Sequence, residues 1–424
     1  MMMGNRAHNQ RRFRRALACS MLLIVTSASA VTLPSHEHVA LPVDDALTLS
    51  AAIDIAYARY PTTAEILART EQADAWTDRG SSWLADRPSL MLRYQSDRWG
   101  SDNGLYEYEA GIVLPLWSWG GRSAVQMLGE TMSLESAAAE LAVRWEVAGL
   151  LRSALWNIAL AENDHELAEQ ALETAQRLTT SVKRRYELGD VAMIDVLHAE
   201  SFYLEAQTKL IEVTAMLLDA ERVYRSVTGM ERRPPFSGEI ISALYDVESD
   251  HPALAFANAE VRRAEAGLIV AEETAATGTS LLVGARRESP ALGDFYDDSI
   301  GITLSIPFGG SSSRKTKISV ASRAAARARA AQAEQVRALT MALHEAAHSL
   351  NVVRENMATA TERMKLVDRH QVMGLSAYEK GELDLFDLLK LQATALDAKR
   401  QVTRLIIDEK RQAALYNQAV GILP

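Results

Sequence analysis

The sequence has one cysteine, few aromatic residues and few prolines, and each shortage limits the structures or chemistry that we expect of the chain. The single cysteine, Cys19, lies in a segment that we expect to be removed, so the mature chain has no disulfide, thiolate metal site or cysteine nucleophile. Aromatic residues make up only 6% of the chain, which favours helices packed through small side chains. No proline occurs between Pro115 and Pro234 or between Pro307 and Pro424. Because a proline inside a helix costs about 3 kcal/mol, these two spans predict very long helices.

The first thirty residues have the pattern of an export signal. A basic start precedes the apolar stretch ALACSMLLIV and a small-residue cleavage site that ends at Ala30. The apolar stretch is too short to stay in a membrane as a helix, and most of it follows Cys19, so we expect no lipidation. We predict a signal peptide over residues 1–30 and an N-terminal extension over residues 31–46. The basic start consists of Arg6, Arg11, Arg12, Arg14 and Arg15.

The charge of the mature chain argues against a nucleic-acid partner. Cleavage would remove five of the 45 basic residues and none of the 55 acidic ones, so the formal net charge would go from −10 to −15. An acidic surface repels a phosphate backbone and suits a cationic partner or solute.

The chain contains a tandem duplication. Residues 186–197 (YELGDVAMIDVL) and 378–389 (YEKGELDLFDLL) match at an offset of 192. Such agreement at one long period indicates two copies of one large unit rather than a solenoid. We predict a first repeat over residues 47–238 and a second over residues 239–424. Prolines align in nearly the same register: Pro115 with Pro307, and Pro61 with Pro252.

Each repeat is predicted to contain a helix, two strands and a long helical hairpin. In the first repeat we expect the opening helix over residues 48–85, with Ser50 as its N-cap. About sixty helical residues then lead to a reversal at Gly189 or Gly381, and about forty return. At 1.5 Å per residue the longer helix would be on the order of 90 to 100 Å long. A seam of small and apolar residues supports a coiled coil in the first copy: Leu167, Ala171, Ala175, Leu178 and Val182.

The predicted strands alternate between apolar and other residues. In LYEYEAGIVLPL, residues 105–116, the alternation places Glu107 and Glu109 on the face opposite the large apolar side chains. SIGITLSIP, residues 299–307, alternates in the same way. Four strands cannot close a barrel alone, and unpaired edges cannot face lipid, so a membrane barrel would need several chains. We predict a mainly α chain with a small β part, in which three chains would supply twelve strands.

One stretch resembles an enzyme motif. In MALHEAAHSLN, His344, Glu345 and His348 form the H-E-x-x-H pattern that binds zinc in many metalloproteases. The first copy lacks these ligands at the equivalent positions, and a third ligand would have to come from the same predicted helix. We therefore expect no catalytic residue and no cofactor, and keep His344 and His348 only as candidate metal contacts. The stretch SHEH, residues 35–38, is expected to be a solvated segment.

Together these features resemble the TolC-type outer membrane factors, the exit ducts of tripartite efflux pumps and type I secretion systems. The resemblance covers residues 47 to 422 and rests on the opening LTLSAAIDIAYARYP, on strands ending in LPL or IPF, and on the two repeated turns. The sequence GELDLFDLL, residues 381–389, is most similar to the heavy-metal and cation efflux branch.

The resemblance implies a homotrimer, with a twelve-stranded barrel in outer membrane lipid and a helical tunnel in the periplasm. Asp195 and Asp387 would line the periplasmic gate, or would simply be surface acids near a turn. Glu107 and Glu109 would face the barrel lumen. The residues that would contact a periplasmic adaptor protein are Leu188, Gly189, Asp190, Lys380, Gly381 and Glu382.

The implied function is passive export of small solutes, with metal cations among the candidates. An inner-membrane pump of the RND type would supply the energy through the adaptor. Three alternatives stay open: a zinc metallopeptidase centred on His344 and His348, a type I protein secretion duct, and a periplasmic coiled-coil protein without a barrel.

Overall fold

The computed structural model describes residues 40–274, 278–291 and 293–424. The chain divides into two units, Met1–Ala40 and Leu41–Pro424, and every helix and strand named below belongs to the second. The predicted signal peptide and the SHEH stretch lie outside the described residues.

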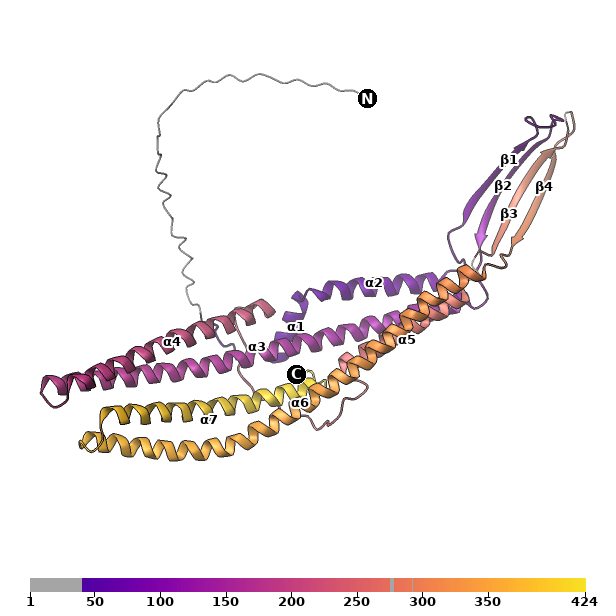
Figure 1. Ribbon diagram of the computed structural model, residues 1–424. Helices are drawn as coiled ribbons and strands as arrows, with labels where there is room; N and C mark the ends of the chain where they lie inside the picture. The colour runs from indigo at the N-terminus through magenta and orange to yellow at the C-terminus, as the bar shows by residue number, and fades with distance from the viewer. Residues whose placement is uncertain (1–39, 275–277, 292) are drawn as a thin grey trace, which may run out of the picture. The chain divides into compact units, whose positions relative to one another are not determined.

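Long helices and four antiparallel strands make up this second unit, which confirms the predicted fold class (Figure 1). The elements up to the first hairpin are α1 (Leu49–Arg59), α2 (Thr62–Ser81), β1 (Ser89–Ser96), β2 (Tyr106–Pro115), α3 (Gly121–Glu187) and α4 (Met193–Thr228). The remaining elements are α5 (Pro252–Glu273), β3 (Ser280–Ser289), β4 (Asp297–Ser305), α6 (Ser311–Glu379) and α7 (Leu385–Ala419).

The opening helix differs from the prediction, because it is two helices rather than one. Pro61 separates α1 from α2, and Tyr60 before it is extended, with φ −69° and ψ 130°. A residue before proline is pushed out of the helical region by the proline ring, so the break follows from the sequence. The N-cap is Thr48 rather than Ser50, since the Thr48 hydroxyl accepts a hydrogen bond from the N–H of Ala51 at 3.1 Å.

The four strands form one sheet in the order β1-β2-β3-β4, with every neighbouring pair antiparallel. The β2–β3 pairing joins the two repeats. The register places Leu90, Ile112, Val283 and Ile302 side by side across the sheet. These side chains share a face because residues directly opposite one another on neighbouring strands point to the same side of the sheet.

The two long hairpins reach the predicted length. α3 has 67 residues and α6 has 69, so each is about 100 Å long at 1.5 Å per residue. Three residues of the predicted seam are buried: Leu167, Ala175 and Val182. A main apolar core lies where α1, α3 and α4 meet, and it includes Ala52, Leu151, Ile158 and Tyr224.

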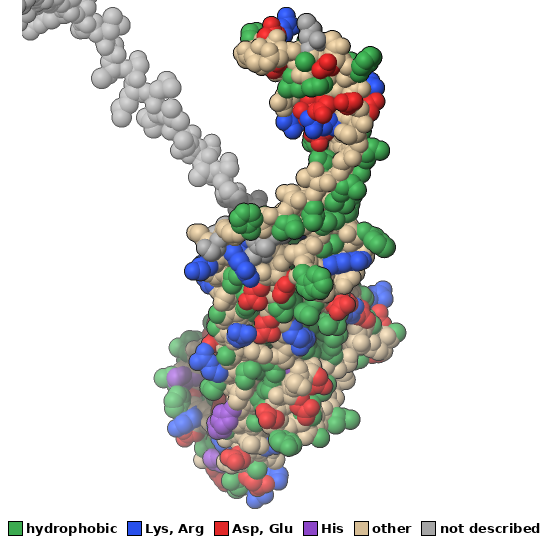
Figure 2. Space-filling model, turned by 90° about the vertical axis from the view of Figure 1, so that its right-hand side faces the viewer, with side chains coloured by type: hydrophobic (Ala, Val, Ile, Leu, Met, Phe, Trp, Pro, Cys, Tyr) green, Lys and Arg blue, Asp and Glu red, His purple; other side chains and the backbone are tan. Residues whose placement is uncertain are grey.

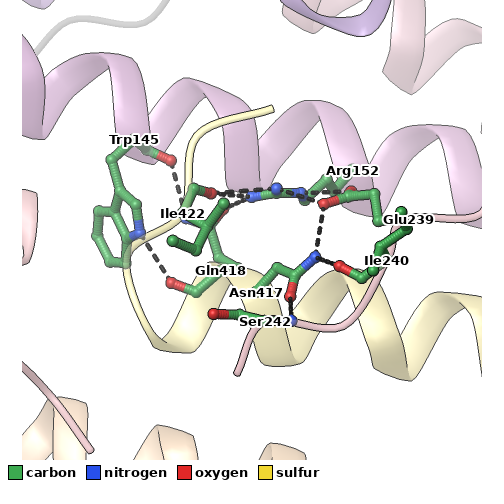
Figure 3. Close-up of polar contacts among 8 residues, drawn as sticks. All are labelled: Trp145, Arg152, Glu239, Ile240, Ser242, Asn417, Gln418 and Ile422. Carbon is green, nitrogen blue, oxygen red and sulfur yellow. Dashed lines mark hydrogen bonds and ion pairs between the residues drawn. The ribbon is translucent and has the colours of Figure 1, made fainter. Parts of the chain in front are cut away.

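A cluster of hydrogen bonds and one ion pair links the C-terminal segment and the segment between the repeats to α3 (Figure 3). Arg152 of α3 is 1% exposed and forms an ion pair with Glu239 at 2.7 Å. Its guanidinium also donates to the carbonyl of Ile422 at 3.1 Å and to the side chain of Gln418. Asn417 donates to Glu239 at 3.1 Å, and the Trp145 indole donates to the carbonyl of Gln418 at 2.8 Å. A buried arginine is tolerated here because its charge and its donors are satisfied.

Candidate functional site

The apolar face of the sheet is exposed. Leu90, Leu92, Ile300 and Ile302 are each more than 70% exposed. Large exposed aromatic residues lie beyond both ends of the strands. They are Trp99 and Phe295 at one end, and Trp83, Trp119 and Phe308 at the other. An apolar band between two aromatic girdles is the arrangement of a sheet whose outer face contacts lipid.

The opposite face carries the two glutamates singled out by the sequence, but their charges are matched by arginines. Glu107 is 5% exposed, and its carboxylate lies 3.0 Å from Nε of Arg286 and 3.8 Å from Nη1 of Arg93. Glu109 is also 3.8 Å from Nη1 of Arg93. Charged side chains of both signs gather over the strands (Figure 2). The sheet thus presents a mixed ion-pair cluster rather than two free acids.

Sequence reasoning missed Arg93 and Arg286. The signal that could have found them is the strand register, which places both directly opposite Glu109 on neighbouring strands. Side chains opposite one another on antiparallel strands interact, and opposite charges at these positions stabilise the sheet.

The two hairpin tips have the same backbone structure. Gly189 and Gly381 adopt φ values of +79° and +77°, which strain any other residue. The N–H of Gly189 donates to the carbonyl of Tyr186, and that of Asp190 donates to the carbonyl of Arg185, both at 2.9 Å. This is the Schellman helix end, and the second tip repeats it. All six residues predicted to contact an adaptor are exposed: Leu188, Gly189, Asp190, Lys380, Gly381 and Glu382.

The two acids predicted for the gate lie in different surroundings. The carboxylate of Asp195 accepts a hydrogen bond from the N–H of Ala192 at 3.2 Å, so it caps α4. In the second hairpin Asp384 caps α7 instead, by accepting from the N–H of Asp387 at 2.8 Å. The side chain of Asp387 is exposed. Only Asp387 therefore has a carboxylate that is not committed to a helix cap.

A contact that the sequence did not reveal links the two tips. Tyr378 at the end of α6 is 9% exposed and packs with Val182 and Leu388 from other helices. The Arg185 guanidinium lies 5.1 Å from the centre of the Tyr378 ring and 2.7 Å from Asp190. Burial raises the pKa of Tyr378, while the positive charge of Arg185 acts in the opposite direction. The tips are therefore joined through an arginine that no local motif marks.

The H-E-x-x-H residues do not assemble a zinc-protease centre. His344, Glu345 and His348 are all exposed on the middle of α6. Among the described residues, no three His, Cys, Asp or Glu side chains come together closely enough to hold a metal ion. In addition, none of the helices in the described part of the chain has an apolar stretch long enough to cross a bilayer.

Comparison with known proteins identifies the family. The model of the outer membrane efflux protein family matches residues 52–229. These residues belong to the outer membrane efflux protein family. The match thus indicates an outer membrane efflux channel of the TolC type, a transporter rather than an enzyme. No curated protein matches the chain in sequence.

Solved structures share the fold at low sequence identity. The outer membrane protein VceC from Vibrio cholerae is 14% identical, with a TM-score of 0.71 over 88% of this chain and 96% of that one. The CmeC outer membrane channel of Campylobacter jejuni is 15% identical, with a TM-score of 0.69 over 92% and 90%. The MtrE outer membrane channel of Neisseria gonorrhoeae, solved in an open state, is 16% identical, with a TM-score of 0.65 over 88% of each chain.

Proposed function

We propose that three copies of this channel form a passive exit duct for a tripartite efflux system. The duct would carry small solutes, metal cations among them, from an RND-type inner-membrane pump through a periplasmic adaptor to the exterior. The observation that carries the proposal is the open sheet, in which β1 and β4 each have a partner on one side only. Unpaired strand edges cannot face lipid, so another chain must pair with them, and three chains supply twelve strands.

Cross-linking of the two edges tests the trimer. The variant carries Ser96→Cys on β1 and Asp297→Cys on β4, which lie at the same end of the sheet. A short bis-maleimide should produce dimers and then trimers in membranes, because each β1 edge would meet the β4 edge of a neighbour. The single variants serve as controls and should give no cross-linked species on a denaturing gel. A ladder that stops at dimers or extends past trimers contradicts the proposed assembly.

The exposed tips support the proposed adaptor contact. Both tips end in the same turn, and both carry exposed charged residues. Lys380→Glu should strongly reduce adaptor-dependent export without changing the trimer. Lys365→Glu, at an exposed position on the same helix away from the tip, is the matched control and should export normally. Equal export by the two variants would refute the contact.

We also propose that Asp387 contributes more than Asp195 to an acidic ring at the periplasmic gate. Three uncommitted carboxylates around a narrow pore attract cations and repel one another. Asp387→Asn should therefore reduce the cation selectivity of single channels in planar bilayers. Asp195→Asn should change selectivity less, because the Asp195 carboxylate already accepts a hydrogen bond from the N–H of Ala192. Equal losses of selectivity in both variants would contradict this ranking.

A further inference from the structure

The H-E-x-x-H stretch, which the channel function does not use, has a distinct surface arrangement. Leu343, Ala346 and Leu350 of α6 are 8%, 7% and 4% exposed and form the side of the helix that packs on the protein. A helix turns by about 100° per residue, so His344 and His348 lie on its opposite side. Residues four apart on a helix are neighbours, with Cβ atoms about 5–6 Å apart. The two imidazoles are therefore adjacent and accessible.

Nothing in the described part of the chain competes for these imidazoles. No hydrogen bond or ion pair there involves His344 or His348. Residues 338–353 contain no lysine or arginine, and Glu345 lies between the two histidines. The local charge therefore favours a cation over an anion.

We propose that His344 and His348 form a two-histidine site for a divalent transition-metal cation, with water completing the coordination. Imidazole suits copper, nickel and zinc, while magnesium and calcium prefer oxygen ligands. With only two protein ligands and no closed cage, the site exchanges its metal readily, unlike the closed four-ligand sites that structural zinc occupies. The site goes beyond the proposed duct, since it binds the cation whatever solute the channel carries.

The duplication makes this site specific to the second repeat. At the offset of 192, His344 corresponds to Arg152 and His348 to Trp156. Arg152 and Trp156 are 1% and 6% exposed, so both positions are buried in the first repeat. One site per chain is expected.

The test is a titration of the tag-free channel in detergent with Cu²⁺, followed by calorimetry and electron paramagnetic resonance. The background carries His36→Ala and His38→Ala, because SHEH could bind the same ion. We expect one Cu²⁺ per chain with two coordinated nitrogens. Either His344→Ala or His348→Ala should weaken binding by at least about 10-fold, because the second ligand then no longer acts intramolecularly. The spectrum should then show one nitrogen.

Two controls decide whether the pair itself is the site. His370→Ala removes another exposed histidine of α6 and should leave the isotherm unchanged. The combination of His348→Ala with Ser349→His keeps two histidines but moves one to another side of the helix, and should bind as weakly as the single variants. Unchanged binding in this spacing variant, or in the double variant His344→Ala with His348→Ala, would overturn the proposal. So would an equal loss in His370→Ala.

Discussion

The hairpins α3–α4 and α6–α7 have nearly the same length but very different surroundings. In α3, 24 residues are buried, whereas in α6 only 8 of the residues whose side chains are described are buried. The difference arises because α2, α4, α5 and the C-terminal segment all pack on α3. The duplication has therefore kept the backbone plan while giving the two copies opposite roles in the core.

The contrast is sharpest at positions that the duplication makes equivalent. Arg152 is the centre of the polar cluster in Figure 3, while His344 at the same place in α6 is exposed. Trp156 stacks on Phe236 with ring centres 6.2 Å apart, while His348 is exposed. Equivalent substitutions in the two copies should therefore have unequal effects, which can be measured.

The largest difference is expected between Arg152→Ala and His344→Ala. Removing the buried Arg152 leaves Glu239, whose side chain is 15% exposed, without its charge partner, and breaking a buried pair costs about 3–5 kcal/mol in the free energy of unfolding. His344→Ala should stay within about 0.5 kcal/mol of the parent, as surface changes do. Chemical denaturation of the detergent-solubilised channel, followed by circular dichroism, measures both.

A double variant distinguishes the effect of the Arg152–Glu239 ion pair from the effect of side-chain packing. Arg152→Met with Glu239→Leu removes both charges at once, so it should lose less stability than Arg152→Ala. If Arg152→Ala and His344→Ala denature at the same midpoint, the inferred asymmetry between the two copies is wrong.

The next largest difference is expected between Glu135→Gln and Arg327→Gln, which are again 192 residues apart. Glu135 of α3 is 4% exposed and lies 2.6 Å from both Arg69 of α2 and Arg263 of α5. Burial raises its pKa and outweighs the opposing effect of the two arginines, so Gln relieves part of this desolvation cost but leaves both arginines without their charge partner. We expect Glu135→Gln to cost about 2 kcal/mol in the free energy of unfolding, the range for hydrogen bonds to charged groups. Arg327 is exposed.

Thermal melting of the two variants checks this prediction. Arg327→Gln should melt with the parent, and Glu135→Gln should melt lower. A shift of the same size in both variants would mean that the ion pairs between α2, α3 and α5 contribute nothing beyond surface electrostatics.

Much of this fold could be predicted from the sequence, because its signals are local or periodic. Proline-free spans predicted the long helices, and alternation predicted the strands. The break at Pro61 had a local signal as well, the proline itself, but the helical pattern on both sides of it led us to predict one continuous helix. Arg93, Arg185 and Arg152 could not be assigned in this way, because their partners come from other elements and are set by register and packing.

A smaller effect should appear in acid, at His251 and its counterpart Tyr60, which precede Pro252 and Pro61. His251 is 2% exposed and its Nδ1 accepts from the N–H of Ala253, capping α5. Burial lowers its pKa, while the nearby backbone carbonyls and Asp250 act in the opposite direction. Below about pH 6.5, His251 is therefore protonated more readily in the unfolded chain than in the folded chain. The free energy of unfolding then falls by up to about 1.4 kcal/mol per pH unit. Above about pH 6.5, neutral His251 makes its full contribution to the stability of the folded chain.

Denaturation between about pH 7.5 and 5 checks this dependence, since the window spans the ordinary pKa of histidine. His251→Gln should flatten the acid side of the curve, because it removes the histidine whose pKa burial lowers. Tyr60→Phe should leave the pH dependence as it is, since the hydrogen bond to Glu146 raises the pKa of Tyr60 and keeps the phenol protonated in this range. If His251→Gln has the parent's acid sensitivity, another group is responsible.

The smallest effect is expected at the tips, where the two copies should respond alike. A Cβ added to Gly189 or to Gly381 meets nothing within 4 Å, so the cost comes only from the positive φ, about 1 kcal/mol. Because the turns are at the ends of long helices, the loss should be local rather than global. Hydrogen exchange at the N–H groups of Asp190 and Glu382, which close the two turns, should accelerate about 5-fold in Gly189→Ala and Gly381→Ala respectively, since about 1.4 kcal/mol is tenfold. Unequal acceleration would show that the tips, too, have diverged.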